Sequence, residues 1–163
     1  MDKKSRFIQV IKQNEGLIFK VAILYTNSLH DREDLYQEIV FQLWKSFDSF
    51  GEKSKLSTWM YRVAMNTAIY NLKSSKRQVN TIPIDMETDL FAEEVDKSEE
   101  ARIKQLYDNI QTLNLLERGI ILLYLEGKSH QEIAEIIGIT SSNVGTKVLR
   151  IKEKLKSRII KKQ

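Results

Sequence analysis

The sequence predicts an all-α protein of two small helical domains joined by an acidic linker. Apolar residues recur at three- and four-residue steps along most of the chain, which is the spacing of amphipathic helices. The 163 residues include only six glycines and one proline, and no long stretch alternates between apolar and polar residues as a strand would. This length suits one or two small domains, and 42% hydrophobic residues are enough for each domain to bury a core.

The charges fall into three blocks. Residues 1–84 carry 13 Lys/Arg and 8 Asp/Glu, residues 85–100 carry one Lys and eight acids, and residues 101–163 carry 12 Lys/Arg and 6 acids. Two basic blocks therefore flank an acidic one. Such separation indicates two modules that face nucleic acid and a tether that avoids it.

Several classes of protein are disfavoured. The chain has no cysteine, which excludes disulfides and cysteine-based zinc sites, and His30 and His130 are far apart in sequence. We find no glycine-rich phosphate loop and no metal-ligand spacing, so we expect neither an enzyme nor a cofactor. The longest apolar run, residues 120–125, is far short of the roughly 18 residues that a membrane span needs. Charges interrupt the N-terminal segment, which does not look like a signal peptide, so we expect a cytoplasmic protein without membrane insertion.

The first domain is predicted to span residues 5–77 as a bundle of three or four helices. Residues 5–29 form an amphipathic helix interrupted near Gly16, and Asp31 is a plausible N-cap for the next helix. That second helix has one apolar arc and one polar side. Phe41 lies on the polar side, as an isolated surface residue or as part of a docking face. The arc comprises Leu35, Tyr36, Ile39, Val40, Leu43, Trp44 and Phe47.

The third helix is expected to begin behind Ser57 or Thr58 and is apolar around most of its circumference. Its polar stripe combines two cations with an amide, and aromatic residues flank it. Cations that follow phosphates and rings that stack on bases suit single-stranded nucleic acid. The alternative is a core helix whose aromatics pack inward beneath a solvated strip. The stripe and its neighbours are Trp59, Arg62, Asn66, Ile69, Tyr70 and Lys73.

Residues 78–100 contain the only proline, Pro83, and most of the clustered acid, so they are interpreted as a linker. Residues 101–126 resume helical spacing as two helices that meet at Asn114, the second spanning residues 115–125 and stopped by Gly127. The simplest interpretation of the linker is a solvated acidic spacer.

Residues 128–157 have the spacing of a helix-turn-helix: Ala134, then Gly138 four residues later, then Val144 six residues later. Ser129 and Glu132 can form a capping box, and Thr140 or Ser141 caps the last helix. Its core face is predicted at residues 144, 148, 151 and 155, and the first helix of the pair should turn residues 133, 134 and 137 inward. Polar and basic residues face outward, where they could reach a DNA major groove or, alternatively, solvate a protein-binding module.

These segments, DREDLYQEIVFQLW, STWMYRVAMN with its basic end, and GKSHQEIAEIIGITSSNVGTKVLRIKEKLK, resemble the extracytoplasmic-function (ECF) sigma factors of bacterial RNA polymerase. The first two resemble sigma region 2 and the third resembles region 4, in the family's order over residues 5–160. One departure is Asn114, which stands where the family commonly has proline and leaves that helix start less fixed.

The resemblance implies three parts: sigma region 2 at residues 5–77, an acidic linker at 78–100 that threads through polymerase, and region 4 at 101–160. It implies core RNA polymerase, promoter DNA and an anti-sigma factor as partners, with the polymerase doing the chemistry. The residues expected to bind the polymerase clamp are Asp34, Gln37, Glu38, Phe41 and Trp44. Those expected at the −10 element are Lys53, Lys55, Trp59, Arg62, Asn66, Ile69 and Lys73. Those expected at the −35 element are Ser141, Ser142, Asn143, Thr146, Lys147 and Arg150.

The alternative is a stand-alone helix-turn-helix transcriptional regulator with an N-terminal helical dimerisation or effector domain. Such a protein should dimerise and bind a palindromic site without polymerase.

Overall fold

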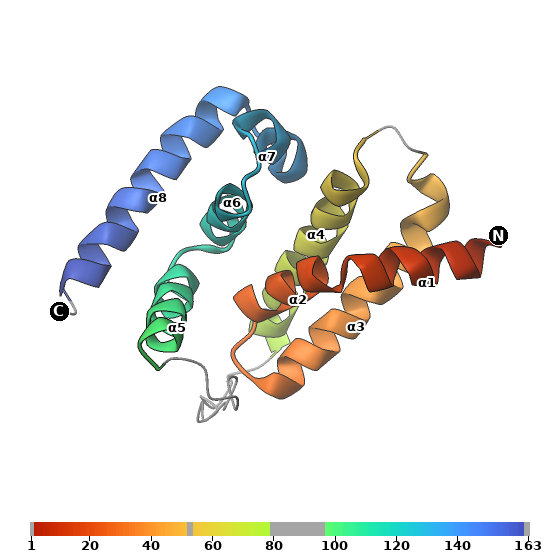
Figure 1. Cartoon of the computed structure of the whole chain (residues 1–163), viewed down its shortest axis with the longest axis horizontal. Coiled ribbons are helices and arrows are strands. Elements are labelled where there is room, and N and C mark those ends of the chain that lie inside the picture. The colour runs from red at the N-terminus through yellow and green to blue at the C-terminus, as the bar shows by residue number, and fades with distance from the viewer. Residues whose placement is uncertain (1, 52–53, 79–96, 162–163) are drawn as a thin grey trace. The chain divides into compact units, whose positions relative to one another are not determined.

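A computed structural model describes residues 2–51, 54–78 and 97–161, and within these ranges every regular element is a helix (Figure 1). The chain divides into two compact units, Met1–Thr88 and Asp89–Gln163. The predicted all-α class is therefore confirmed. Most of the predicted linker, residues 79–96 with Pro83, lies outside the described residues.

Unit 1 contains four α-helices and a short 3-10 helix: α1 (Lys3–Gln13), α2 (Glu15–Leu24), α3 (Leu29–Ser46), η1 (Phe47–Ser49) and α4 (Leu56–Gln78). Helices α2, α3 and α4 contact one another and bury the core. Each of these helices places apolar residues at helical spacing on the buried side, as amphipathic helices do. The fully buried side chains include Ile18, Val21, Leu24, Ile39, Leu43, Met60 and Ala64.

The predicted interruption near Gly16 is confirmed and lies at Asn14, whose side chain donates a hydrogen bond to the Val10 carbonyl (2.8 Å). Two other helix boundaries in unit 1 differ from the prediction. Ser28 rather than Asp31 caps α3, since the Ser28 hydroxyl accepts from the Asp31 backbone N–H (3.1 Å). Helix α4 begins at Leu56, which places Ser57 and Thr58 inside its first turn rather than at its cap.

Unit 2 contains α5 (Lys97–Gln111), α6 (Leu115–Leu125), α7 (His130–Ile137) and α8 (Ser141–Lys161). The predicted bounds of α6 are confirmed, and its start is well fixed. The Asn114 side chain accepts from the Glu117 N–H (2.8 Å) while Glu117 accepts from the Asn114 N–H (3.3 Å), a complete capping box. The expectation of a loosely fixed helix start at Asn114 was therefore wrong. Helix α5 also begins earlier than predicted, at Lys97.

Two glycines turn the chain between the helices of unit 2. Gly127 (φ 81°) ends α6 and Gly138 (φ 88°) ends α7, and both adopt the left-handed conformation that other residues rarely tolerate. The Ser129 and Glu132 capping box that starts α7 is confirmed. In α7 the buried residues are Ile133 and Ile136, whereas Ile137, predicted to face inward, is only half-buried.

Helix α8 carries the predicted core face. Val144, Val148, Ile151 and Leu155 are all buried, and α8 contacts α5, α6 and α7. Its cap is Thr140, whose hydroxyl accepts from the Asn143 N–H (3.1 Å). In the described part of the chain, no helix is long and apolar enough to cross a membrane.

Candidate nucleic-acid and protein interfaces

The polar side of α3 carries the five residues predicted to bind polymerase. Asp34, Gln37 and Phe41 are exposed, and Glu38 and Trp44 are half-buried. Phe41 is the large apolar member, with 52% of its side chain exposed. Its ring lies 5.6 Å from the Lys45 ammonium, and about half of the side chain is available to a partner. The prediction that Phe41 lies outside the apolar arc of α3 is confirmed.

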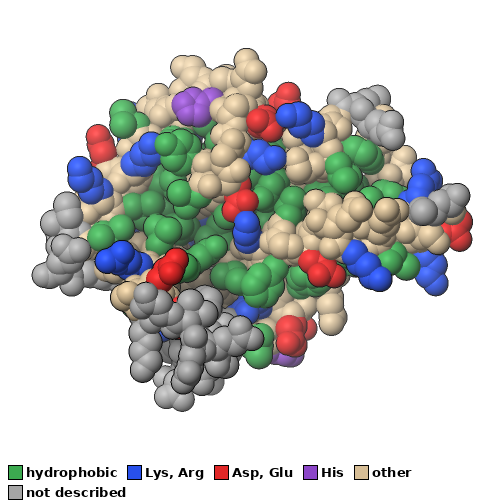
Figure 2. Space-filling view, viewed as in Figure 1, with side chains coloured by type: hydrophobic (Ala, Val, Ile, Leu, Met, Phe, Trp, Pro, Cys, Tyr) green, Lys and Arg blue, Asp and Glu red, His purple; other side chains and the backbone are tan. Residues whose placement is uncertain are grey.

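An open groove of about 410 Å³ runs beside this face, between α1 and α3. Gln37, Phe41 and Trp44 of the predicted set line the α3 side. Lys4, Phe7 and the 43%-exposed Ile8 line the α1 side. Apolar side chains of this kind appear as green surface in Figure 2. Helical spacing alone does not show that α1 lines a groove beside these α3 residues, because that depends on where α1 packs.

Aromatic and ionic contacts hold α1 against α3 and η1. The Phe7 ring packs edge-on against the rings of Trp44 (5.1 Å) and Phe47 (5.3 Å). Lys3 places its ammonium 4.1 Å from the centroid of the Trp44 ring and 2.9 Å from an Asp48 carboxylate oxygen. The half-buried state of Trp44 follows from these contacts, so Trp44 forms a wall of the groove.

The predicted −10 face lies along α4. Lys55, Asn66 and Lys73 are exposed, and Arg62 and Ile69 are half-buried. Residues 62, 66, 69 and 73 follow one another at three- and four-residue steps, so they share one side of the helix. Lys53, the remaining cation of the predicted set, lies outside the described residues.

Trp59, which was expected to stack on a base, is 92% covered in the structure, with 8% of its side chain exposed. The rings of Phe50 (5.0 Å) and Phe47 (6.2 Å) lie beside it. Instead, Tyr70 is the exposed aromatic on this side of α4, at 72%. The sequence places both Trp59 and Tyr70 beside the polar stripe of α4, but only the structure shows that Trp59 is buried and Tyr70 is exposed.

The predicted −35 residues lie in the first three turns of α8. Ser141, Ser142, Asn143, Thr146 and Arg150 are exposed and Lys147 is half-buried. Gly145 lies among them, and a Cβ at this position would stand 3.5 Å from the His130 imidazole at the start of α7. The side chains on this surface are hydroxyls, an amide and cations, the groups that hydrogen-bond to base edges and phosphates.

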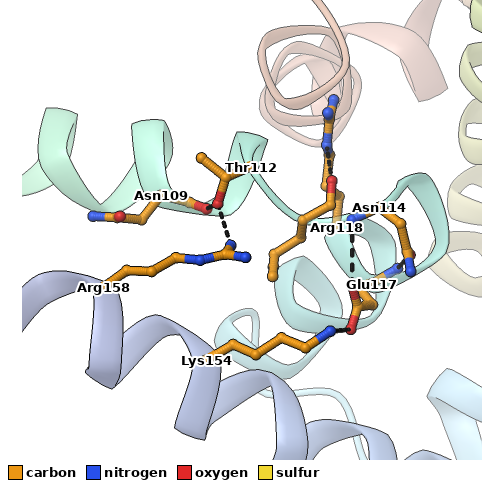
Figure 3. Close-up of polar contacts among 8 residues, drawn as sticks. Asn109, Thr112, Asn114, Glu117, Arg118, Lys154 and Arg158 are labelled. Atoms are coloured by element: carbon orange, nitrogen blue, oxygen red, sulfur yellow. Dashed lines mark hydrogen bonds and ion pairs between the residues drawn. The ribbon is translucent and has the colours of Figure 1, made fainter.

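The rest of α8 is held by polar contacts to α6 and to the turn that follows α5 (Figure 3). Lys154 donates to Glu117 (2.8 Å), and Arg158 donates to the Thr112 hydroxyl. Two residues before Lys154, Lys152 donates to the Tyr124 hydroxyl. These three cations hold the helix within unit 2, and the charge of half-buried Lys147 also helps to lower the pKa of Glu117. Arg150 is exposed on the outward-facing surface of the helix.

Glu117 joins the start of α6 to α8. Burial acts to raise the pKa of Glu117, but the hydrogen bonds from Lys154 and from the Asn114 backbone outweigh it and hold the pKa below its usual value. The carboxylate is therefore ionised at neutral pH. Among the described residues, no group of three or more His, Cys, Asp or Glu side chains could hold a metal ion.

Two family models match the chain, one in each unit. The model of sigma-70 region 2 matches residues 10–78, and the model of sigma-70 region 4 matches residues 103–155. The first range includes α3 and α4 with their exposed faces. The second includes α7 and most of α8.

The similar curated proteins are RNA polymerase sigma factors of the extracytoplasmic-function class. The chain is 32% identical to the ECF RNA polymerase sigma-E factor of Haemophilus influenzae, over 86% of this chain and 82% of that protein. It is 25% identical to the ECF sigma factor SigW of Bacillus subtilis, over 94% and 88% of the two chains. A shorter match, 45% identical over 53 residues, covers only 14% of the ECF sigma factor SigG of Mycobacterium tuberculosis.

Two solved structures share the fold. The sigma factor RpoE of Bartonella quintana, crystallised with the anti-sigma factor NepR, matches with a TM-score of 0.74 at 19% identity, over 93% of this chain and 95% of that one. CnrH in complex with the cytosolic domain of CnrY matches with a TM-score of 0.71 at 16% identity, over 99% and 92%.

Proposed function

Because the chain belongs to the extracytoplasmic-function sigma factors of RNA polymerase, we propose that unit 1 binds core polymerase and the −10 element while unit 2 binds the −35 element. The single observation that carries this division is the order of the family matches: region 2 on unit 1 and region 4 on unit 2. Each unit presents an exposed polar face in the matched range.

The docking face for polymerase is the exposed side of α3, at Asp34, Gln37, Glu38, Phe41 and Trp44. The exposed carboxylate of Asp34 and the half-buried carboxylate of Glu38 offer charge, half-exposed Phe41 offers an apolar anchor, and aromatic anchors dominate the energy of many interfaces. The groove between α1 and α3 adjoins this face and supports an extension of it onto α1.

The DNA-binding faces are two separate weak sites. On α4 the contacts come from residues 55, 62, 66, 69 and 73, with Lys53 and Trp59 retained as predictions from the sequence. On α8 they come from residues 141, 142, 143, 146, 147 and 150. Each site alone should bind promoter DNA weakly. Docking both on one polymerase raises the effective concentration of each site for its element.

The chain itself is proposed to catalyse no reaction, since the polymerase forms the phosphodiester bonds. It acts where the polymerase and the chromosome are, in the cytoplasm. An anti-sigma protein is a further proposed partner. The support is that one of the similar solved structures is a sigma factor, RpoE, in complex with the anti-sigma factor NepR.

The test is transcription in vitro. Purified chain is added to sigma-free core polymerase with a library of promoter fragments, and RNA 5′ ends are mapped. We expect start sites that depend on the chain and that share two upstream elements. Binding of a palindromic site by a dimer without polymerase would instead support a stand-alone regulator and refute the sigma function.

A further inference from the structure

We propose that Glu117 weakens the sequence-independent binding of DNA by unit 2, because its carboxylate counterbalances the charge of Lys147 on the proposed −35 surface. This role rests on the −35 contact proposed above and adds a residue that acts against it. Glu117 lies on α6, outside the six residues of α8 that are proposed to contact DNA. Its side chain is only 13% exposed, so water and salt screen its charge poorly.

Glu117 faces one side of α8. Its carboxylate accepts a hydrogen bond from the Lys154 ammonium at 2.8 Å (Figure 3). Lys147 precedes Lys154 by seven residues, which places the two side chains within about 20° of each other around the helix. They therefore share the side of α8 that packs against α6. Lys147 is accordingly half-buried, whereas the neighbouring Thr146 and Arg150 are exposed.

The charges of Glu117 and Lys147 act on each other. Burial acts to raise the pKa of Glu117, and hydrogen bonds from Lys154 and the Asn114 backbone act to lower it. The charges of Lys154 and Lys147 lower the same pKa further, so that it lies below its usual value. Because this attraction is mutual, a phosphate that approaches Lys147 meets a cation whose charge is already partly balanced by an ionised carboxylate.

The negative charge of Glu117 comes from outside the DNA-facing helix. Residues 141–152, the first three turns of α8, contain three Lys or Arg and no Asp or Glu. In α7, Glu132 is engaged in the capping box with Ser129 and pairs with Lys128 (3.9 Å). Without Glu117, the start of α8 would present cations with no opposing acid on the same helix, a surface suited to any phosphate backbone.

The consequence concerns the search for promoters. Phosphate contacts carry no sequence information and supply essentially all of the affinity for non-specific DNA. A stronger phosphate contact would hold the free chain on DNA of any sequence. By reducing this contribution, Glu117 leaves the choice of site to the holoenzyme, in which both units are docked on one polymerase.

The test measures binding of the purified full chain, without core polymerase, to two short fluorescent duplexes over a series of salt concentrations. One duplex carries the upstream element found by the transcription assay, and the other carries a scrambled element. Glu117→Gln should raise the affinity for both by about 5-fold at about 0.15 M salt, the gain from one further phosphate contact, and should steepen the plot of log K against log salt by about 0.9. The ratio of the two affinities should stay the same, because phosphate contacts read no sequence.

Three controls separate this effect from others. Asp108→Asn removes one negative charge from an exposed position on α5 and should change neither affinity nor salt dependence. In a Lys147→Ala background Glu117→Gln should have no effect, whereas in a Lys154→Ala background the gain should remain. Circular dichroism at the assay temperature verifies that each variant is folded. Partial unfolding would lower the affinity, which is opposite in sign to the expected gain.

Each contrary result has a distinct meaning. If Glu117→Gln binds both duplexes as the wild type does, or more weakly, the proposal is refuted and Glu117 only supports the fold. A gain that persists in the Lys147→Ala background would show that Lys147 is not the cation concerned, and the proposal would be wrong. A gain confined to the duplex with the upstream element would place Glu117 in base recognition, which also contradicts it. Failure of the wild-type chain to direct any start site would refute the sigma function itself, whatever the binding of Glu117→Gln.

Discussion

The Lys154 ammonium lies 2.8 Å from one oxygen of the Glu117 carboxylate, and the other oxygen accepts from the Asn114 backbone N–H. One side chain thus completes the cap of α6 and pairs with α8, the helix that carries the proposed −35 contacts (Figure 3).

Glu117→Gln should lower the free energy of unfolding of unit 2 in a pH-dependent way. Glutamine can still complete the capping box, so the variant removes mainly the charge facing Lys154. The folded state lowers the pKa of Glu117, so its contribution is present above the unfolded pKa of about 4.3 and is lost as pH falls through the lower, folded value. We expect a loss of up to about 1 kcal/mol at pH 7, since Lys154 is half exposed, and a smaller loss at pH 3.

Urea unfolding of the full chain measures this effect. Both tryptophans, Trp44 and Trp59, are in unit 1, so their fluorescence reports that unit while circular dichroism reports both. Glu117→Ala is the comparison variant and should cost about 1 kcal/mol more, because the cap is lost too. An equal deficit for Glu117→Gln at both pH values would show that the charge is not what matters.

Arg150→Ala should weaken promoter binding by about 1–3 kcal/mol if the guanidinium contacts a base, and should relax preference at one position of the upstream element. The side chain is exposed on α8, so the fold should not change. Gel-shift titrations of the holoenzyme against promoter variants provide the measurement. Lys156→Ala, another exposed cation of α8, should leave base preference unaltered. An unchanged footprint over the upstream element in Arg150→Ala would contradict the proposed contact.

Phe41→Ala should reduce affinity for core polymerase while the helical content and unfolding midpoint stay as in the wild type. The ring is 52% exposed, so its removal leaves no cavity in the core. Co-purification with core polymerase, followed by a competition titration, gives the affinity. Leu29→Ala truncates a similarly exposed apolar residue near the other end of α3 and serves as the matched control. If the Phe41→Ala protein recovered normal amounts of core polymerase, Phe41 would not contribute to this interface.

Two glycines of the helix-turn-helix should respond to alanine with opposite signs. At Gly138, where φ is 88°, a Cβ is strained, and Gly138→Ala should destabilise unit 2 by about 1 kcal/mol or more. At Gly145, inside α8, an added Cβ would meet His130 at 3.5 Å, an ordinary contact, and alanine should gain up to about 1 kcal/mol of helix propensity.

The Gly145 variant also tests whether this residue allows close approach to DNA. Stability is compared by thermal unfolding and function by promoter affinity. A more stable Gly145→Ala protein with weaker −35 binding would show that the glycine is retained for the interface. Normal DNA binding by the stabilised variant would instead show that the space over Gly145 is not used by DNA.

The helices could be predicted from local signals wherever those signals were unambiguous. The Asn114 junction and Gly127 bracket α6, which lies at the predicted residues, and the Gly138 turn and the core face of α8 were also correct. The predicted start of α3 was wrong because two nearby residues could each act as its N-cap. Ser28 and Asp31 are both good caps, and only the backbone geometry shows which side chain accepts the hydrogen bond.

The exposure of individual site residues depends on tertiary packing. Spacing places Trp59 and Tyr70 on the same side of α4, yet the segment that contains η1 brings Phe47 and Phe50 over Trp59 and leaves Tyr70 uncovered. Likewise, no periodic pattern shows that Ile8 of α1 will line a groove beside Phe41 of α3. Both features arise from contacts between segments distant in sequence.

The allocation of side chains along α8 has an evolutionary consequence. The groups that anchor this helix, its buried arc and the cations at 152, 154 and 158, are largely different from the six residues between 141 and 150 that are proposed to contact DNA, of which Lys147 alone also acts on Glu117. If the proposed contacts are correct, substitutions at the exposed positions among these six would redirect the protein to new target genes with little loss of thermodynamic stability. Paralogues arising by gene duplication could diverge in regulon while inheriting the same scaffold.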